Sequence, residues 1–104
     1  MLKTTSDMVP GREISETIGL VTANAVRARH VGRDVLAGLK NLIGGEIGAY
    51  RQLLTESRQE ALERLDEVAE EMGADAVVAL RLTTSSVAQS SSEILAYGTA
   101  VKLR

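Results

Sequence analysis

The sequence predicts a small α+β domain in which helices cover one side of an antiparallel sheet. Two observations support this fold class. The spacing of apolar residues changes along the chain from two to three or four and back to two. A long charged helix also gives way to an apolar strand at residues 73–78 with no room for a loop. The predicted order is strand, helix, helix, strand, strand, with three main strands in a two-layer fold.

Length and composition predict one modest core. The chain has 104 residues, enough for a single domain. Phe and Trp are absent and the two aromatic residues are Tyr50 and Tyr97, so the core must be built from Leu, Val, Ile and Ala. These side chains bury less area each. Because a partner subunit would cover further apolar surface, we expect a homo-oligomer.

Charge and cysteine content exclude several functional classes. The net charge is −2, which offers no basic field to a phosphate backbone, so we expect no nucleic-acid partner. The absence of cysteine excludes disulfides, thiolate nucleophiles and cysteine metal sites. The start of the chain lacks a basic region followed by an apolar run, and no segment approaches the ~20 apolar residues that span a bilayer. We expect a cytoplasmic protein without membrane contact or cofactor.

The first predicted strand follows a turn. Pro10 presets one backbone dihedral and Gly11 supplies the next, so residues 9–12 predict a turn. The strand occupies residues 13–26 and has two unequal faces. The larger face carries Ile14, Ile18, Leu20 and Val26, and the smaller face carries Ser15, Thr17, Gly19, Val21, Ala23 and Ala25.

Two amphipathic helices are predicted next. Apolar residues recur at three- and four-residue steps over residues 31–43, and a pair of glycines ends this first helix. The second begins near residue 46, places Glu60 and Arg64 for an ion pair one turn apart, and reaches Gly73, which suits a left-handed cap. Its apolar stripe consists of Leu54, Ala61, Leu62, Leu65, Val68, Ala69 and Met72.

The last two strands are predicted as a loose hairpin. They cover residues 76–82 and 95–103, and the segment 83–92, rich in Ser and Thr, is interpreted as a solvated loop. Ala96, Gly98 and Ala100 would line the face of the sheet away from the helices. That face is small rather than charged, so we expect another molecule to pack there. The opposite strand faces carry Ala76, Val78, Leu80, Leu82, Leu95, Tyr97, Val101 and Leu103.

Several short motifs occur in a fixed order along nearly the whole chain, at residues 10–11, 33–34, 41–45, 50, 58 with 61, 73–77 and 98–101. Together they resemble the YbjQ-like family of bacterial proteins, which are often labelled as heavy-metal-binding domains. The resemblance implies a β-α-β-β subunit like that of dodecin, with antiparallel pairing and short extra strands that assemble subunits into a ring of five. It implies no established activity. Asp75 stands where the family more often has Asn.

His30 and Asp34 are the candidate metal ligands. They stand four residues apart near a helix start, so both could face one ion. Zinc sites need three or four ligands, mostly nitrogen or sulfur, and no third ligand is evident. Asp34 also interacts well with the helix dipole as a first-turn acid. The sequence therefore favours a pair at the helix start, with metal binding as the alternative.

Arg58 is the candidate for a structural ion pair. It follows the apolar stripe of the second helix, and an unpaired buried charge is strongly destabilising. We expect it to pair with Asp75 or with an acid of another subunit. Anion binding is one alternative, and a stem lying on apolar surface with its head in water is another.

Three functions are consistent with these features. The first is a non-catalytic oligomeric domain that binds a small ligand or partner at its subunit interfaces. The second is heavy-metal binding, as the family label suggests. The third is an enzyme with a site between subunits, but Glu16, Glu93 and the helix acids form no recognisable acid–base pair, so no catalytic residue is predicted.

Overall fold

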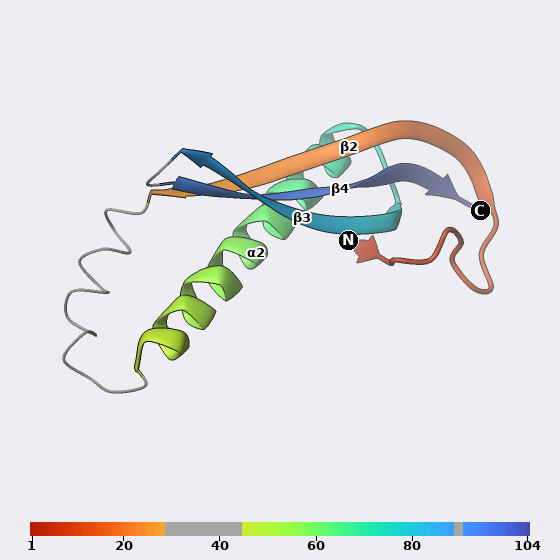
Figure 1. Ribbon diagram of the computed structural model, residues 1–104. Coiled ribbons are helices and arrows are strands. Elements are labelled where there is room, and N and C mark those ends of the chain that lie inside the picture. The colour runs from red at the N-terminus through yellow and green to blue at the C-terminus, as the bar shows by residue number, and fades with distance from the viewer. Residues whose placement is uncertain (29–44, 89–90) are drawn as a thin grey trace.

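A computed structural model describes residues 1–28, 45–88 and 91–104 of the chain. It contains, in chain order, β1 (Leu2–Lys3), β2 (Ile14–Ala28), α2 (Gly45–Glu71), β3 (Ala76–Ala88) and β4 (Ser91–Leu103). The sheet carries α2 on one face, which confirms a small two-layer α+β fold (Figure 1). The predicted first helix lies outside the described residues. No helix of the described parts is long and apolar enough to cross a membrane.

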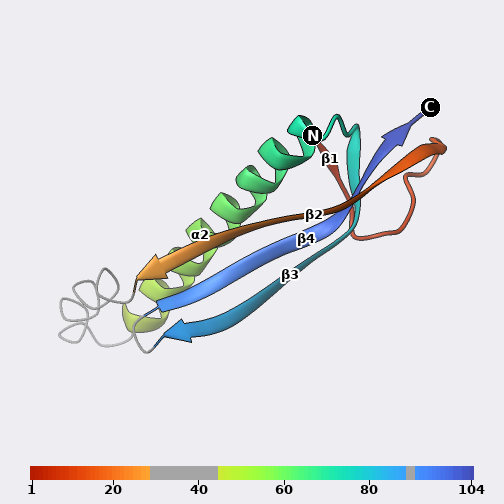
Figure 2. The same ribbon diagram turned by 90° about the horizontal axis from the view of Figure 1, so that it is seen from above.

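The sheet has four strands in the order β1-β3-β4-β2 (Figure 2). The central strand β4 runs antiparallel to both β2 and β3. β1 pairs with β3 in parallel, through Leu2 with Ala76 and Lys3 with Val77. The sheet is therefore mixed rather than purely antiparallel. A two-residue strand is too short to show alternating hydrophobicity, so the sequence pattern did not predict β1.

The hairpin strands are longer than the sequence predicted. β3 continues to Ala88 and β4 begins at Ser91, so most of the expected loop at residues 83–92 is paired strand. Gln89 and Ser90, at the tip, lie outside the described residues. β2 pairs with β4 as far as Ala28, opposite Ser91. Backbone hydrogen bonds between paired strands do not require apolar side chains, so a polar stretch can form strands.

The structure places the small residues of the sheet against α2, which corrects the predicted orientation. Ala96 and Ala100 of β4 are fully buried there, together with Val21 and Ala25 of β2. Leu20, which we assigned to the larger face of its strand, is exposed on the opposite side. Small side chains allow a helix to lie close to the sheet, so the alanines form the interface and not an open face.

Two bulges explain why the alternating pattern did not predict the faces of β2 correctly near its start. The register of β2 against β4 slips between Ile14 and Glu16 and again between Thr17 and Gly19. Each extra residue reverses which face the following side chains occupy. Ile18 therefore packs on the cluster beneath α2, whereas Ile14 packs on a second cluster.

That second cluster lies on the other side of the sheet. Its buried members are Ala76, Val78 and Val101, and Val9 packs against it from the N-terminal segment. The first residues of the chain thus cover one end of the face that α2 leaves open. The remainder of that face carries the exposed side chains discussed below.

The predicted features of α2 are largely present. Ala61, Leu65 and Ala69 are fully buried, as the apolar stripe predicted. Nη2 of Arg64 lies 3.2 Å from Oε1 of Glu60, which confirms the ion pair one turn apart. The stripe stops short of the start of the helix, where Leu54 is 42% exposed.

The glycine turns predicted at Gly11 and Gly73 are confirmed, whereas the predicted end of the first helix lies outside the described residues. Gly73 has φ of 82° and donates its N–H to the carbonyl of Glu70, while Ala74 donates to Ala69. These two bonds define a Schellman cap and end α2. Gly11 has φ of 80° in the turn before β2, a conformation that glycine adopts without strain.

Candidate functional site

The face of the sheet turned away from α2 is the candidate functional surface. Val21, Ala23 and Ala25 pair with residues that face α2, so the residues between them point to the other side. We call this surface, between the second cluster and the hairpin tip, the open face. It consists of Leu20, Thr22, Asn24 and Val26 of β2, Arg81, Thr83 and Ser85 of β3, and Glu93, Leu95, Tyr97 and Thr99 of β4.

Apolar side chains stand uncovered on the open face. Leu20 is 71% exposed and Val26 is 52% exposed, and both belong to the edge strand β2. Leu95 and Tyr97, on the central strand, are half-buried. A sheet face with this composition can bury apolar area against another surface.

Three polar side chains form a cluster near the hairpin end of the open face. Glu93 accepts a hydrogen bond of 2.8 Å from Nδ2 of Asn24 and one of 3.4 Å from Oγ of Ser85. The three residues come from β4, β2 and β3, so the cluster spans the sheet. Both donors are neutral, and the arrangement offers carboxylate oxygens as hydrogen-bond acceptors.

Arg81 connects the open face to the N-terminal segment. Its Nη1 donates to the backbone carbonyl of Thr5 at 2.9 Å and to that of Leu80 at 2.8 Å. The guanidinium group thereby holds the N-terminal segment at the outer edge of β3. Sequence patterns gave no signal for this contact, because residues 76 positions apart meet only through the fold.

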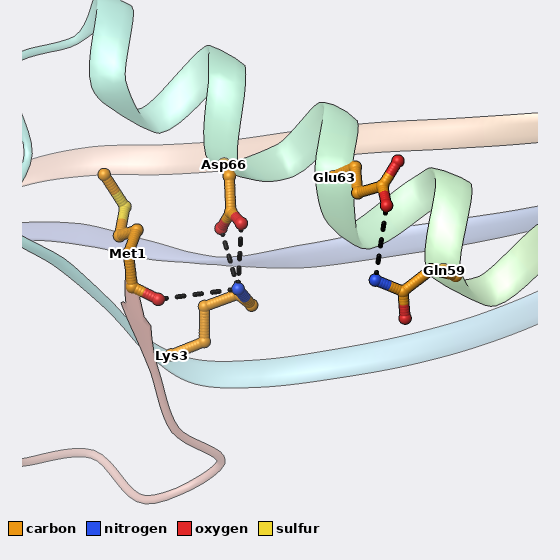
Figure 3. A network of polar contacts seen from close by, with 5 residues as sticks. All are labelled: Met1, Lys3, Gln59, Glu63 and Asp66. Atoms are coloured by element: carbon orange, nitrogen blue, oxygen red, sulfur yellow. Dashed lines mark hydrogen bonds and ion pairs between the residues drawn. The ribbon is translucent and has the colours of Figure 1, made fainter.

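A second contact holds the N-terminal segment on α2 (Figure 3). Nζ of Lys3 lies 2.9 Å from both carboxylate oxygens of Asp66. Both side chains are about three-quarters buried, with exposures of 24% and 25%. This ion pair joins β1 to α2 and was also not predicted from the sequence.

The expected ion pair between Arg58 and Asp75 does not form within the described chain. Arg58 is exposed, and its Nη2 donates to Oγ1 of Thr55 at 3.1 Å. Asp75 accepts a hydrogen bond of 2.9 Å from the backbone N–H of Leu103. The stripe of α2 turns toward the sheet and leaves Arg58 on its flank, so the charge is not buried. Pairing with an acid of another subunit stays a prediction.

Metal-ligand geometry is absent from the parts of the chain that the structure describes. No three His, Asp or Glu side chains in residues 1–28, 45–88 and 91–104 are grouped so that they could hold an ion. His30 and Asp34 lie outside these ranges. Their proposed pairing therefore stays a prediction.

The YbjQ family model, described as "Putative heavy-metal-binding", matches residues 1–104. The chain belongs to this family. The resemblance found in the sequence motifs is thereby confirmed over the full length. The family description names no catalytic activity.

Proteins from distant organisms are similar to this chain over nearly its whole length. A "UPF0145 protein" of Psychromonas ingrahamii is 54% identical over 104 residues, which is 100% of this chain and 99% of that protein. A "UPF0145 protein" of the archaeon Archaeoglobus fulgidus is 54% identical over 101 residues, which is 97% of this chain and 94% of that protein. The family thus occurs in bacteria and in an archaeon, and neither name includes an activity.

The fold is shared with a solved structure. A protein of unknown function from Pediococcus pentosaceus, assigned to the DUF74 family, superimposes with a TM-score of 0.68 over 100% of this chain and 98% of its own. The two sequences are 19% identical. The similarity supports the architecture of the sheet and helix and carries no functional argument.

Proposed function

We propose that this chain is a non-catalytic, homo-oligomeric domain that binds a small ligand or partner where its copies meet. In this arrangement the open face of one copy is covered by the next. The observation that carries the proposal is the exposure of Leu20 and Val26 on a sheet face, at 71% and 52%. Burying such side chains is worth about 25 cal/mol per Å² of apolar surface.

The small core favours association. Among the described residues, the largest fully buried side chains are those of Leu65, Val21, Val77 and Val101. Much of the remaining core is alanine, which contributes little apolar area. Burial of the open face against a neighbour would supply area that one copy lacks.

The positions of the exposed side chains favour a ring over a two-fold dimer. Leu20 and Val26 lie on the open face, whereas the exposed Leu54 belongs to α2 on the opposite side of the sheet. Two different patches on opposite sides suit a head-to-tail contact, which closes into a ring when the rotation allows it. We take five copies as the number, from the family resemblance.

The polar cluster suggests what such a ring would bind. Glu93, with Asn24 and Ser85, presents oxygen acceptors beside the apolar part of the open face. A neighbouring copy that covers the apolar part would leave these acceptors at the boundary. A small ligand with hydrogen-bond donors, or a donor group of a partner, suits that position.

Static light scattering at micromolar concentration tests the association. Wild-type protein should have the mass of five copies. Leu20→Asp places a charge on the open face and should dissociate the oligomer. Leu82→Asp is the matched control, because Leu82 is 42% exposed but pairs with Ala96 on the side facing α2, and it should keep the mass. A wild-type protein that is a monodisperse monomer would rule the proposal out.

Native mass spectrometry tests the ligand. The oligomer, purified without added metal, should retain a small molecule that is lost when Leu20→Asp dissociates the copies. A ligand retained in full by the monomeric variant would place binding elsewhere in the chain.

Heavy-metal binding is the second candidate, and the family description supports it. Against it stands the composition, because the chain has no Cys and one His, and these are the residues that soft and borderline metals prefer. Stoichiometric binding of zinc, copper or cadmium would favour this candidate.

A further inference from the structure

Glu93 is a half-buried carboxylate without a basic partner on the open face. It accepts hydrogen bonds from Nδ2 of Asn24 at 2.8 Å and from Oγ of Ser85 at 3.4 Å, and both donors are neutral. No Lys or Arg within residues 1–28, 45–88 and 91–104 forms an ion pair with it. Because an ionised carboxylate offers about four acceptor positions, two of them stay available for a further donor.

The surroundings of Glu93 combine this charge with an exposed apolar side chain. Val26 lies directly opposite Glu93 in the register of β2 and β4, and it is 52% exposed. Paired residues of neighbouring strands share one face of a sheet, so the two side chains are adjacent. No other residue of the open face is acidic. A surface that covers this part of the open face therefore needs a basic group next to an apolar one.

The start of α2 presents that combination on the opposite side of the sheet (Figure 1). Leu54 is 42% exposed, and Arg58 follows one helical turn later, so the two side chains lie on the same side of α2. Arg58 is exposed and forms no ion pair within the part of the chain that the structure describes. Its Nη2 donates to Oγ1 of Thr55 at 3.1 Å, which restricts the orientation of the guanidinium group and leaves its other donors available.

Most other basic side chains that the structure describes do not suit Glu93. Three of them already pair with acids of the same chain: Lys3 with Asp66, Arg64 with Glu60 and Arg104 with Glu13. Arg81 lies on the open face itself, and a head-to-tail contact joins two different surfaces. Arg12 belongs to the turn of Val9, which covers the second cluster on the same side of the sheet.

Two further basic residues are exposed. The side chain of Lys102 lies beside Gly73, at the end of α2 away from Leu54. Arg51 lies three residues before Leu54, but its side chain forms no hydrogen bond or ion pair within the described residues. Fixing Arg51 against Glu93 would cost more side-chain entropy than fixing Arg58, which Thr55 already orients. The geometry therefore favours Arg58.

A second copy of this chain is the partner that matches both surfaces. Each copy carries the acidic pair, Glu93 with Val26, on one side of the sheet and the basic pair, Arg58 with Leu54, on the other. A foreign partner would cover one of these pairs and leave the other without its complement. A ring of head-to-tail contacts covers both pairs in every copy, because each copy turns one surface toward each neighbour.

We propose that Arg58 of one copy binds Glu93 of the next, with Leu54 packed beside Val26. The inference rests on the proposed function and names the two surfaces that meet in the head-to-tail contact. The donor that Glu93 receives at the boundary is then a guanidinium group of the neighbouring copy rather than a ligand. A guanidinium group can donate two parallel hydrogen bonds to a carboxylate, which would fix the relative orientation of the copies.

An exchange of charges tests the pair. Sedimentation of a dilution series gives the protein concentration at which half of the oligomer has dissociated. Arg58→Glu and Glu93→Arg each bring like charges together, so each should raise this concentration about tenfold or more. The double variant restores opposite charges and should return to within about threefold of the wild type.

Lys102→Glu is the matched control for the charge exchange. It makes the same change of charge as Arg58→Glu at an exposed site away from Leu54, so it should leave the dissociation unchanged. Arg51→Glu lies nearer to the contact and should have a smaller effect than Arg58→Glu. Circular dichroism checks that every variant folds.

Cross-linking tests the same contact without relying on charge. The chain has no Cys, so combining Arg58→Cys with Glu93→Cys introduces its only two thiols. These positions lie on opposite sides of the sheet of one copy, so a short bismaleimide should join position 58 of one copy to position 93 of the next. A denaturing gel of the assembled double variant should show multimers larger than the dimer, whereas each single variant should stop at the dimer.

The outcomes separate this inference from the proposed function. If Leu20→Asp dissociates a wild-type oligomer, the proposed function stands, and the inference fails alone if Arg58→Glu dissociates like the wild type. It also fails if Arg51→Glu has the larger effect, or if the double charge variant does not recover. Recovery of Glu93→Arg by Arg81→Glu instead would mean that two open faces meet. A monomeric wild type would overturn the proposed function and this inference together.

Discussion

Gly98 of β4 lies so close to Val77 of β3 that a Cβ atom at position 98 would stand 2.7 Å from Cγ1 of Val77. The same Cβ would stand 3.0 Å from the backbone oxygen of Val78. The close approach coincides with the bulge at Ala79, where φ is 53° and the register of β3 slips against β4. Glycine at position 98 therefore allows β3 to bend without leaving the sheet.

Gly98→Ala should lower the free energy of unfolding by about 1–3 kcal/mol, the usual cost of an extra methyl group in a packed interior. Urea denaturation measures the effect. Adding Val77→Ala removes one of the two clashing neighbours, so the double variant should lose less stability than the sum of the single ones. Additive losses would mean that Val77 is not the neighbour that resists the methyl group.

Removing the charge of Lys3 should detach the start of the chain from α2. Lys3→Met keeps the apolar stem but leaves Asp66 without its 2.9 Å partner, and we expect a loss of about 1–2 kcal/mol. Hydrogen exchange should also accelerate at the N–H of Thr4, which bonds to Val77. Gln59→Ala is the control, because the exposed Gln59–Glu63 contact in Figure 3 is 3.4 Å long and its loss should change stability by less than about 0.5 kcal/mol. Equal effects of the two variants would contradict the role of Lys3.

Arg58→Leu should be close to neutral in a single copy, because the exposed guanidinium group bonds only to Thr55 at 3.1 Å among the described residues. The free energy of unfolding derived from thermal melts should change by less than about 0.5 kcal/mol. The melts should be repeated in the Leu20→Asp background, where we expect separated copies. A large loss confined to the assembled protein would show that Arg58 pairs with an acid of a neighbouring copy.

A single subunit should bind no zinc, copper or cadmium tightly and stoichiometrically. The chain has no Cys and one His, and its three Met residues offer weak thioether ligands. A ring could still hold one shared ion by contributing one His30 from each copy. Calorimetric titration decides between these cases. One ion per subunit at micromolar affinity, lost in His30→Ala, would establish the metal function instead.

Sequence patterns predicted correctly those features whose physical cause lies within a few neighbouring residues. The turn at Pro10 and Gly11, the cap at Gly73 and the ion pair between Glu60 and Arg64 depend on residues within five positions of one another. The buried stripe of α2 follows equally from helical periodicity. None of these features depends on how the strands are arranged.

The orientation of the sheet was decided by tertiary structure. Alternation divides each strand into two faces, but here one face carries large apolar side chains such as Leu20 among polar ones, and the other carries small apolar side chains such as Ala96. Hydrophobicity alone therefore does not choose between them. The close approach of α2 selects the small face, with Ala96 and Ala100 beneath the helix, and exposes Leu20. The face expected to pack against another molecule was therefore predicted on the wrong side of the sheet.

Contacts between residues far apart in the sequence account for the other features that were not predicted. Lys3 meets Asp66, and Arg81 meets Thr5, across sequence separations that no spacing rule covers. The serine-rich hairpin forms strands because β3 and β4 pair with each other and β4 also pairs with β2, and these backbone hydrogen bonds do not depend on the side chains. The sequence by itself thus determined the family, the fold class and the local turns. Only the tertiary structure decided which face and which edge the sheet presents, because those depend on how closely distant segments can pack.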